Sequence, residues 1–145
     1  MATIKTFEEI EAWTKSRSMS NELFQIFTRD PARKDFALKD QINRSIGSVM
    51  DNIAEGFNRG GNREFIQFLS IAKGSAAETQ SQLYRLYDRQ YISKDEFDRL
   101  YQEIFSITRM LGGMLSYLKR SELKGPKFHE PELVYNLPDD RNLKD

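Results

Sequence analysis

The chain has 145 residues, 39% of them hydrophobic and 30% charged, which suits one ordinary domain with a core of its own. Its 22 basic and 22 acidic side chains cancel, and this counts against a nucleic-acid binder that relies on a strong basic excess. The absence of cysteine excludes disulfides, thiolate nucleophiles and cysteine-based metal sites.

The first expected helix covers residues 7–28. It opens on Thr6-Phe-Glu-Glu9, a capping-box pattern in which Thr6 accepts from a free backbone N–H and the Glu9 side chain reaches back. Apolar residues then recur at helical spacing, namely Phe7, Ile10, Trp13, Leu23, Phe24 and Phe27. The run Arg-Asp-Pro-Ala-Arg at residues 29–33 is expected to end this helix.

The second expected helix leads in through Phe36 and Leu38 and ends near Phe57. Its apolar residues are spaced by three or four positions: Ile42, Ile46, Val49, Ile53 and Phe57. The following Asn58-Arg-Gly-Gly-Asn62 is typical of a turn, with Asn62 as the N-cap of the next helix. Because this link is short, the two helices should be antiparallel neighbours.

The third expected helix extends to about residue 90, and the fourth follows a second capping box, Ser93-Lys-Asp-Glu96. The fourth has the most regular apolar row: Phe97, Leu100, Ile104, Ile107, Leu111, Met114 and Leu118. The fold class is therefore all-α, an antiparallel up-down-up-down four-helix bundle over residues 1–120. Residues 121–145 contain prolines at 126, 131 and 138 and should form an extended or disordered tail.

The fourth helix carries a second apolar row formed by Tyr101, Phe105, Gly112 and Leu115. One helix of a monomeric bundle needs one apolar stripe, so the wider stripe predicts burial against something further. We interpret Tyr101, Phe105 and Leu115 as an oligomer interface. In the alternative interpretation, the tail or the first helix covers this row within a monomer.

A polar row lies beside the apolar stripe of the second helix, and a matching row lies on the third. We call them the polar seam; its principal members are Gln41, Arg44, Asn52, Glu55, Ser75 and Glu78. Polar groups at a core margin need hydrogen-bond partners, so the rows should face each other and fix the helix register. The same register places Gly47 opposite Gly74, where two missing side chains would let the helices approach closely. A binding site on this row is the alternative.

The chain offers no recognisable catalytic or cofactor site. A ferritin-like di-metal centre needs Glu-x-x-His pairs on two helices, and the chain has a single histidine, His129. Asp51 and Glu55 share a helix face without a nucleophile beside them, so they are expected to be solvated or ion-paired. With no secretion signal and no run of roughly 20 apolar residues, we expect a cytoplasmic, non-enzymatic protein that needs no cofactor and no membrane.

The second and third expected helices carry a recognisable sequence signature. It consists of residues 41–56, Gln-Ile-Asn-Arg-Ser-Ile-Gly-Ser-Val-Met-Asp-Asn-Ile-Ala-Glu-Gly, together with Arg59, Glu64-Phe-Ile-Gln-Phe-Leu69, Ile71-Ala-Lys-Gly-Ser75 and Glu78. It resembles that of the bacterial four-helix-bundle family, also called the 23S rRNA intervening-sequence protein family. The resemblance runs from about Phe7 to Leu118. The family is in turn similar to the accessory protein of diversity-generating retroelements, a pentamer that binds RNA and a reverse transcriptase.

This resemblance implies a homopentamer that acts as a scaffold and associates with RNA or with an RNA-processing protein such as a reverse transcriptase. Phosphate contacts would then come from basic residues near helix ends and the polar seam. The candidates are Arg33, Lys34, Arg59, Arg63, Arg85 and Arg89. The alternative, favoured by the neutral charge, is a pure protein–protein interaction module that binds no nucleic acid.

Overall fold

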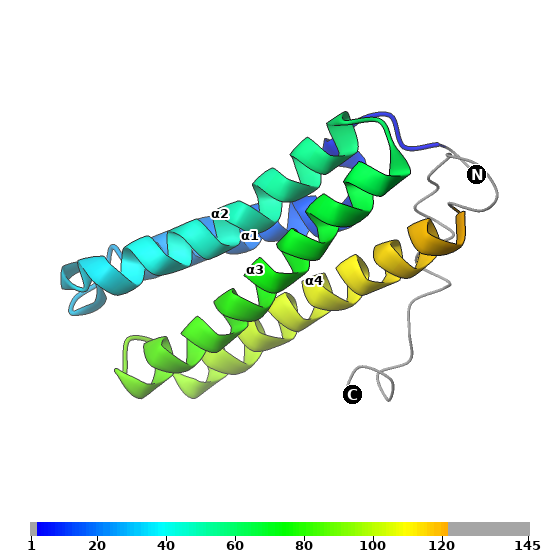
Figure 1. Ribbon diagram of the computed structural model, residues 1–145. Coiled ribbons are helices and arrows are strands. Elements are labelled where there is room, and N and C mark those ends of the chain that lie inside the picture. The colour runs from blue at the N-terminus through cyan, green and yellow to red at the C-terminus, as the bar shows by residue number, and fades with distance from the viewer. Residues whose placement is uncertain (1–2, 122–145) are drawn as a thin grey trace.

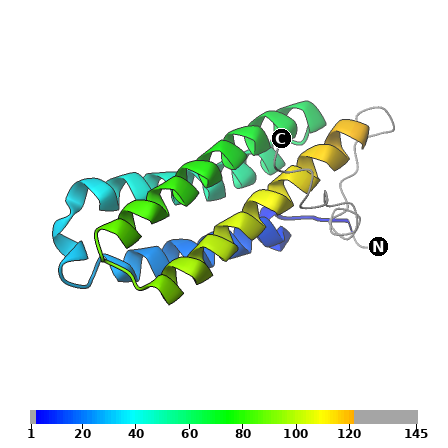
Figure 2. The ribbon, with the colours of Figure 1, turned by 90° about the horizontal axis from the view of Figure 1, so that it is seen from below.

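The structure, a computed structural model, describes residues 3–121, and the expected C-terminal tail lies outside them. The described residues contain the helices α1 (Glu11–Ile26), α2 (Phe36–Asn58), α3 (Asn62–Asp88) and α4 (Lys94–Ser121). Both α1 and α3 pack against α2 and α4, so the helices surround one core in chain order (Figures 1 and 2). The predicted all-α, up-down-up-down bundle is confirmed.

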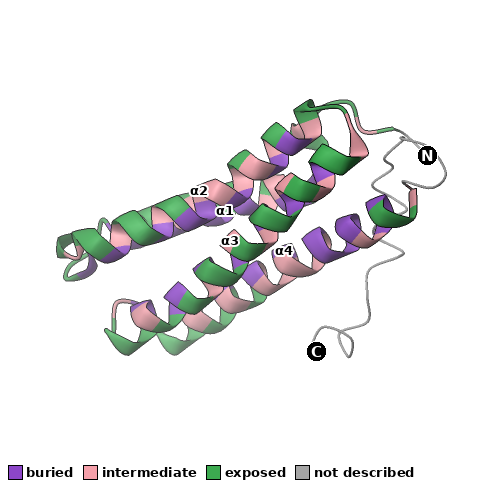
Figure 3. Ribbon diagram, viewed as in Figure 1, coloured by how far each residue is buried: buried purple, intermediate pink, exposed green. Residues whose placement is uncertain are grey.

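The core consists of the apolar rows that face inward (Figure 3). Fully buried side chains from α2 and α4 include Ile42, Ile46, Val49, Ile53, Leu100, Ile104, Ile107 and Leu111. Each such side chain contributes about 1.5–3 kcal/mol when it leaves water, so these rows account for much of the folding free energy. Helix α4 is buried most completely, because residues 111–115 are all buried.

The N-terminal segment departs from the expected single helix. Phe7–Glu9 forms a separate 3-10 turn, and α1 begins at Glu11. The predicted capping box is present, with the Thr6 N–H donating to Glu9 Oε2 over 2.9 Å, but it caps this short turn. The break occurs at Ile10, which is extended (φ −78°, ψ 118°) and fully buried. The bend thus lets Ile10 enter the core, and the Phe7 ring packs 5.1 Å from that of Trp13, centroid to centroid.

The connection between α2 and α3 is tight. Gly60 has φ +85°, and Gly61 is the extended N-cap of α3. Asn62 is the first helical residue, so its predicted role as N-cap was wrong. One turn earlier, a Cβ on Gly56 would lie only 2.6 Å from Phe68 Cβ. The close approach of α2 and α3 near this turn therefore depends on Gly56.

The start of α4 carries the second predicted capping box. The Glu96 N–H donates to Ser93 Oγ over 3.1 Å, and the Ser93 N–H donates to Glu96 Oε1 over 3.1 Å. The hydrogen bond from the Ser93 N–H is the main reason that the pKa of Glu96 is lowered, although partial burial opposes it. Glu96 also pairs with Arg29 over 3.0 Å. This pair links the start of α4 to the segment that follows α1.

Candidate functional site

Three buried polar side chains connect α2 to α3 within the core. Ser45 Oγ donates to Gln82 Oε1 over 2.6 Å, and Thr79 Oγ1 donates to Ser45 Oγ over 2.7 Å. The remaining amide group of Gln82 donates to the Gln41 carbonyl over 3.4 Å. All three side chains are at most 4% exposed. Because buried polar groups need partners, this network favours one register of α2 against α3.

Nearer the surface, a second set of contacts crosses the same helix pair. The hydroxyls of Ser48 and Ser75 lie 2.7 Å apart. Asn52 Nδ2 donates to the Ser48 carbonyl over 2.8 Å and to Ser48 Oγ over 3.0 Å. Two members of the polar seam, Asn52 and Ser75, are thus brought to the α2–α3 boundary.

Ser45 and Thr79 form the centre of this boundary but were not included in the predicted seam. Each occupies a position within an apolar row: Ser45 follows Ile42 by three residues, and Thr79 lies between Ala76 and Leu83. A small hydroxyl side chain at a core position of two paired helices was the signal that could have located them.

The remaining seam residues lie at the surface. Gln41, Arg44 and Glu78 are exposed, and with Gln82 and Arg85 they line a hollow of about 370 Å³ between α2 and α3. Glu55 was expected to find a partner on α3. Instead it accepts from Arg59 over 2.8 Å, one turn along its own helix, and both are exposed. This outer part of the seam is therefore a solvated surface of mixed charge.

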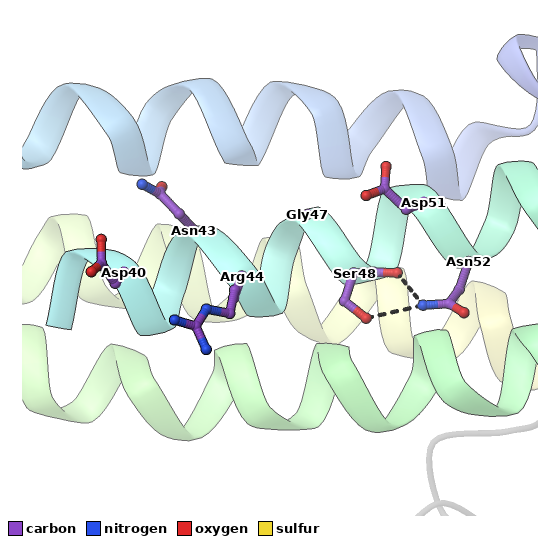
Figure 4. A pocket seen from close by; sticks show the side chains of 7 residues that line it. All are labelled: Asp40, Asn43, Arg44, Gly47, Ser48, Asp51 and Asn52. Atoms are coloured by element: carbon purple, nitrogen blue, oxygen red, sulfur yellow. Dashed lines mark hydrogen bonds between the residues drawn. The ribbon is translucent and has the colours of Figure 1, made fainter. Parts of the chain in front are cut away.

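A larger hollow of about 670 Å³ lies over the middle of α2 (Figure 4). Its lining residues are Asp40, Asn43, Arg44, Gly47, Ser48, Asp51 and Asn52. Asn43 and Asp51 point toward α1, whereas Arg44 points toward α3. A Cβ on Gly47 would meet nothing within 4 Å, and the same holds for Gly74. The expectation that these two glycines permit a close helix approach was wrong, because both face open space.

The six basic residues nominated for nucleic acid divide between the two ends of the bundle. Arg59 and Arg63 lie at the α2–α3 turn, whereas Arg33, Lys34, Arg85 and Arg89 lie at the opposite end, on the left of Figure 1. The 23 residues of α2 separate the two groups by about 33 Å. Arg33 pairs with Asp30, Arg59 with Glu55 and Arg89 with Asp35. The structure thus gives two small basic groups, in which several arginines are already paired with acids.

Asp35 is the centre of the contacts at the left-hand end. As the N-cap of α2, it accepts from the Leu38 N–H over 3.2 Å, and its other oxygen accepts from Arg89 over 2.5 Å and Tyr91 over 2.8 Å. Partial burial alone would raise the pKa of Asp35, but these three donors outweigh it and lower the pKa. The same carboxylate raises the pKa of Tyr91 by accepting a hydrogen bond from its hydroxyl.

Four aromatic rings meet on the outer side of α3 and α4. This aromatic cluster consists of Tyr84, Tyr87, Phe97 and Tyr101. The Tyr84 and Phe97 centroids are 5.0 Å apart, and the Tyr101 hydroxyl accepts from Gln80 over 2.8 Å. Tyr84 is 49% exposed and Tyr87 is 38% exposed. The cluster is a fixed surface with substantial apolar area in contact with water.

The residues predicted to form the oligomer interface lie in two settings. Tyr101 belongs to the aromatic cluster and is half-buried, as is Phe105 one turn along α4. Leu115 is only 7% exposed within the single chain, and Gly112 is buried as well. The second apolar row is therefore covered toward the C-terminal part of α4 and partly open around Tyr101 and Phe105.

The sequence matches a known protein family. A family model described as 23S rRNA-intervening sequence protein matches residues 8–113. The chain belongs to this family. The match spans all of α1, α2 and α3 and most of α4, so the α2–α3 contacts and the aromatic cluster lie within the matched region, whereas Leu115 lies beyond it.

A solved structure shares the fold. It is a crystal structure from Bacteroides thetaiotaomicron described as a protein with unknown function from the S23 ribosomal protein family. The two chains are 25% identical with a TM-score of 0.66, and the match covers 72% of this chain and 97% of that one. A search of the curated proteins found no match. The family's description thus refers to ribosomal RNA, and the solved relative has the same fold as this chain.

The described residues contain no group of three or more His, Asp or Glu side chains placed to hold a metal ion. No helix within residues 3–121 is long and apolar enough to span a membrane.

Proposed function

We propose that the chain is a non-catalytic helical scaffold that forms homo-oligomers and associates with RNA or with an RNA-processing protein such as a reverse transcriptase. The observation that carries the proposal is the aromatic cluster, whose Tyr84 and Tyr87 rings are 49% and 38% exposed. The RNA part is supported by the family's description as a 23S rRNA-intervening sequence protein. A cytoplasmic location agrees with both parts.

The aromatic cluster suits a contact between copies of the chain. Aromatic side chains are enriched at interface centres because they bury a large area at a small cost in conformational entropy. The rings of this cluster contact one another and Tyr101 is held by Gln80, so little order remains to be imposed on binding. A ring of five copies, the number implied by the family resemblance, would also repeat each small basic group around its axis.

The oligomer is tested by light scattering coupled to size-exclusion chromatography. The wild-type peak should have the mass of several subunits, five by resemblance to the family. Tyr84→Glu combined with Tyr87→Glu should reduce it to one subunit with unchanged helical circular dichroism. Ile71→Glu is the matched control, because Ile71 is 50% exposed on the same helix but outside the aromatic cluster. A monomeric wild-type protein would refute the self-association.

The RNA association is tested in the same run by the ratio of absorbance at 260 nm to that at 280 nm. Arg89→Glu is unsuitable because it would place a second carboxylate beside Asp35, which is only 16% exposed and caps α2. The acidic partners of Arg33 and Arg59 are exposed, so reversing these charges should leave the fold intact. The better variants reverse the charge at each end of the bundle separately. One combines Arg33→Glu with Lys34→Glu, and the other combines Arg59→Glu with Arg63→Glu. If only one of these double variants loses the bound RNA, the end that carries its substitutions is the end that binds RNA. The wild-type protein should also retain less RNA as the salt concentration is raised.

A pure protein–protein interaction module is the second candidate. It is favoured by the ion pairs of Arg33 with Asp30, Arg59 with Glu55 and Arg89 with Asp35, which neutralise half of the nominated residues. In that case the oligomer peak shows no excess absorbance at 260 nm. Neither double charge-reversal variant would then differ from the wild type in its ratio of absorbance at 260 nm to that at 280 nm.

A further inference from the structure

Two phenylalanines are exposed at the end of the bundle where α1 ends and α2 begins. Phe36, the first residue of α2, is 71% exposed, the highest fraction among the large hydrophobic side chains described. Phe24, in the second half of α1, is 48% exposed. Rings this open contribute little to the core. Phe24 belongs to the last turn of α1 and Phe36 to the first turn of α2, and these helix ends lie at the left of Figure 1.

A lysine contacts one of these rings and shares a helix face with the other. Lys39 Nζ is 5.4 Å from the centroid of Phe24, a cation–π contact between α2 and α1. Lys39 also follows Phe36 by three residues on the same helix, so these two side chains are neighbours on one face of α2. The Lys39 ammonium thus lies over the Phe24 ring, on the helix face that also carries Phe36.

Two lysines that have no ion-pair partner within the described residues lie near these rings. Lys34 is exposed two residues before Phe36. Of the carboxylates near in sequence, Asp30 and Asp35 are engaged by Arg33 and by Arg89, whereas Asp40, four residues after Phe36, is exposed. Within residues 3–121, neither Lys34 nor Lys39 has a carboxylate within 4.0 Å. Both ammonium groups are therefore available to an anionic partner.

We propose that Phe24, Phe36, Lys34 and Lys39 form a binding surface for single-stranded RNA, with unpaired bases stacked on the rings and phosphates placed at the lysines. This inference rests on the RNA association proposed above and assigns it to one end of the bundle. Aromatic rings beside basic groups suit a single strand because every base has a face that can stack. Duplex RNA keeps its bases stacked inside, so it could use the lysines but not the rings.

An apolar protein partner fits the same surface less well. Covering Phe24 and Phe36 with apolar side chains would also remove the Lys39 ammonium from water without a carboxylate to receive it. A single strand carries one phosphate for each base, so its bases can stack on the rings while its phosphates pair with the lysines. The interleaving of cations with rings is what favours the nucleic acid.

The test is fluorescence anisotropy with the full chain and a fluorescein-labelled oligouridine of about 12 nucleotides, alongside an RNA duplex of the same length. Phe36→Ala and Phe24→Ala keep every charge and should each weaken oligouridine binding at least about fivefold. Ile71→Ala, a side chain of similar exposure on α3, should bind as the wild type does. Lys39→Gln should flatten the dependence of affinity on salt by about one unit of slope.

The outcomes separate this inference from the function on which it rests. If the wild type binds oligouridine and both phenylalanine variants bind it equally well, this surface is wrong and the RNA association stands. The same conclusion follows if the duplex binds as tightly as the single strand. If Phe36→Ala instead changes only the subunit number, the rings belong to a protein interface. If the wild type binds neither probe, this surface and the RNA association both fall.

Discussion

Arg89 Nη1 lies 2.5 Å from Asp35 Oδ2, and this ion pair joins the residue that caps the start of α2 to the residue that caps the end of α3. Tyr91 donates to the same oxygen from the connection between α3 and α4. Asp35 therefore holds together two chain connections that are more than 50 residues apart in sequence. It is a structural centre at the end where RNA binding is proposed.

Replacing Asp35 with alanine should lower the free energy of unfolding by about 1–2 kcal/mol, because the first turn of α2 loses its cap and Arg89 and Tyr91 lose their acceptor. Urea unfolding followed by circular dichroism measures this. Asp40→Ala is the control, since Asp40 is an exposed carboxylate on the same helix beyond its first turn. Equal losses in the two variants would show that Asp35 has no special structural role.

Stability should fall in acid. The pKa of Asp35 is lowered from its ordinary value of 3.8 by its three donors, against the effect of burial, and that of Glu96 is lowered from 4.5 mainly by the Ser93 N–H. A carboxylate with a lowered pKa stabilises the fold above its ordinary pKa, and this contribution is lost as pH falls through the folded value. Stability should therefore be flat near neutrality and decline below about pH 4.5.

Asp35→Asn isolates the charge in that experiment, because asparagine is also a good N-cap. Urea midpoints measured from pH 7 to pH 3 should decline less steeply for this variant than for the wild type. If the urea midpoints of both proteins fall equally as pH is lowered, carboxylates other than Asp35 are responsible for the loss of stability in acid.

Removing the central hydroxyl of the buried network should be costly. Ser45→Ala leaves Gln82 Oε1 without its donor in a region that is almost fully buried, which should cost about 1–3 kcal/mol. Ser48→Ala is the paired control, because Ser48 is only half-buried and water can replace its bond to Ser75, so its cost should stay under about 1 kcal/mol. A second change, Gln82→Leu, should recover part of the loss in Ser45→Ala because it removes the orphaned acceptor.

Three glycines within helices should respond in opposite directions to alanine. Gly56→Ala places a Cβ 2.6 Å from Phe68 Cβ and should destabilise by about 1–3 kcal/mol. Gly47→Ala and Gly74→Ala meet nothing within 4 Å and should each stabilise by about 0.5–1 kcal/mol through helix propensity. Thermal unfolding of the three variants decides this. Destabilisation by Gly74→Ala would mean that another chain packs on that face.

The arrangement of the helices could be predicted because their apolar rows have helical spacing over long stretches. In α4 the row from Phe97 to Leu118 has no interruption, and the Ser93 capping box marks its start. The register of α2 against α3 also followed from the short turn around Gly60, which places Arg44 and Glu78 at the same hollow. Short links leave few ways to pair two regular helices.

What could not be predicted depends on tertiary contacts. The break at Ile10 arises because burying that side chain outweighs the continuation of the helix, and the apolar spacing looks the same in both cases. Spacing also cannot distinguish a glycine at an open surface, as at Gly47, from one at a tight contact, as at Gly56. Whether an arginine is free or paired, as for Arg89, likewise depends on where distant carboxylates lie in space.

Trp13 is the only tryptophan, and it contacts the Phe7 ring while the Arg17 guanidinium lies 5.9 Å from its centroid. Its fluorescence should therefore report on the docking of the Phe7–Glu9 turn onto α1, rather than on the core shared by all the helices. An unfolding curve recorded by tryptophan emission would detect the release of the N-terminal turn. Ellipticity at 222 nm would follow the bundle, so any gap between the two midpoints measures how independently that turn detaches.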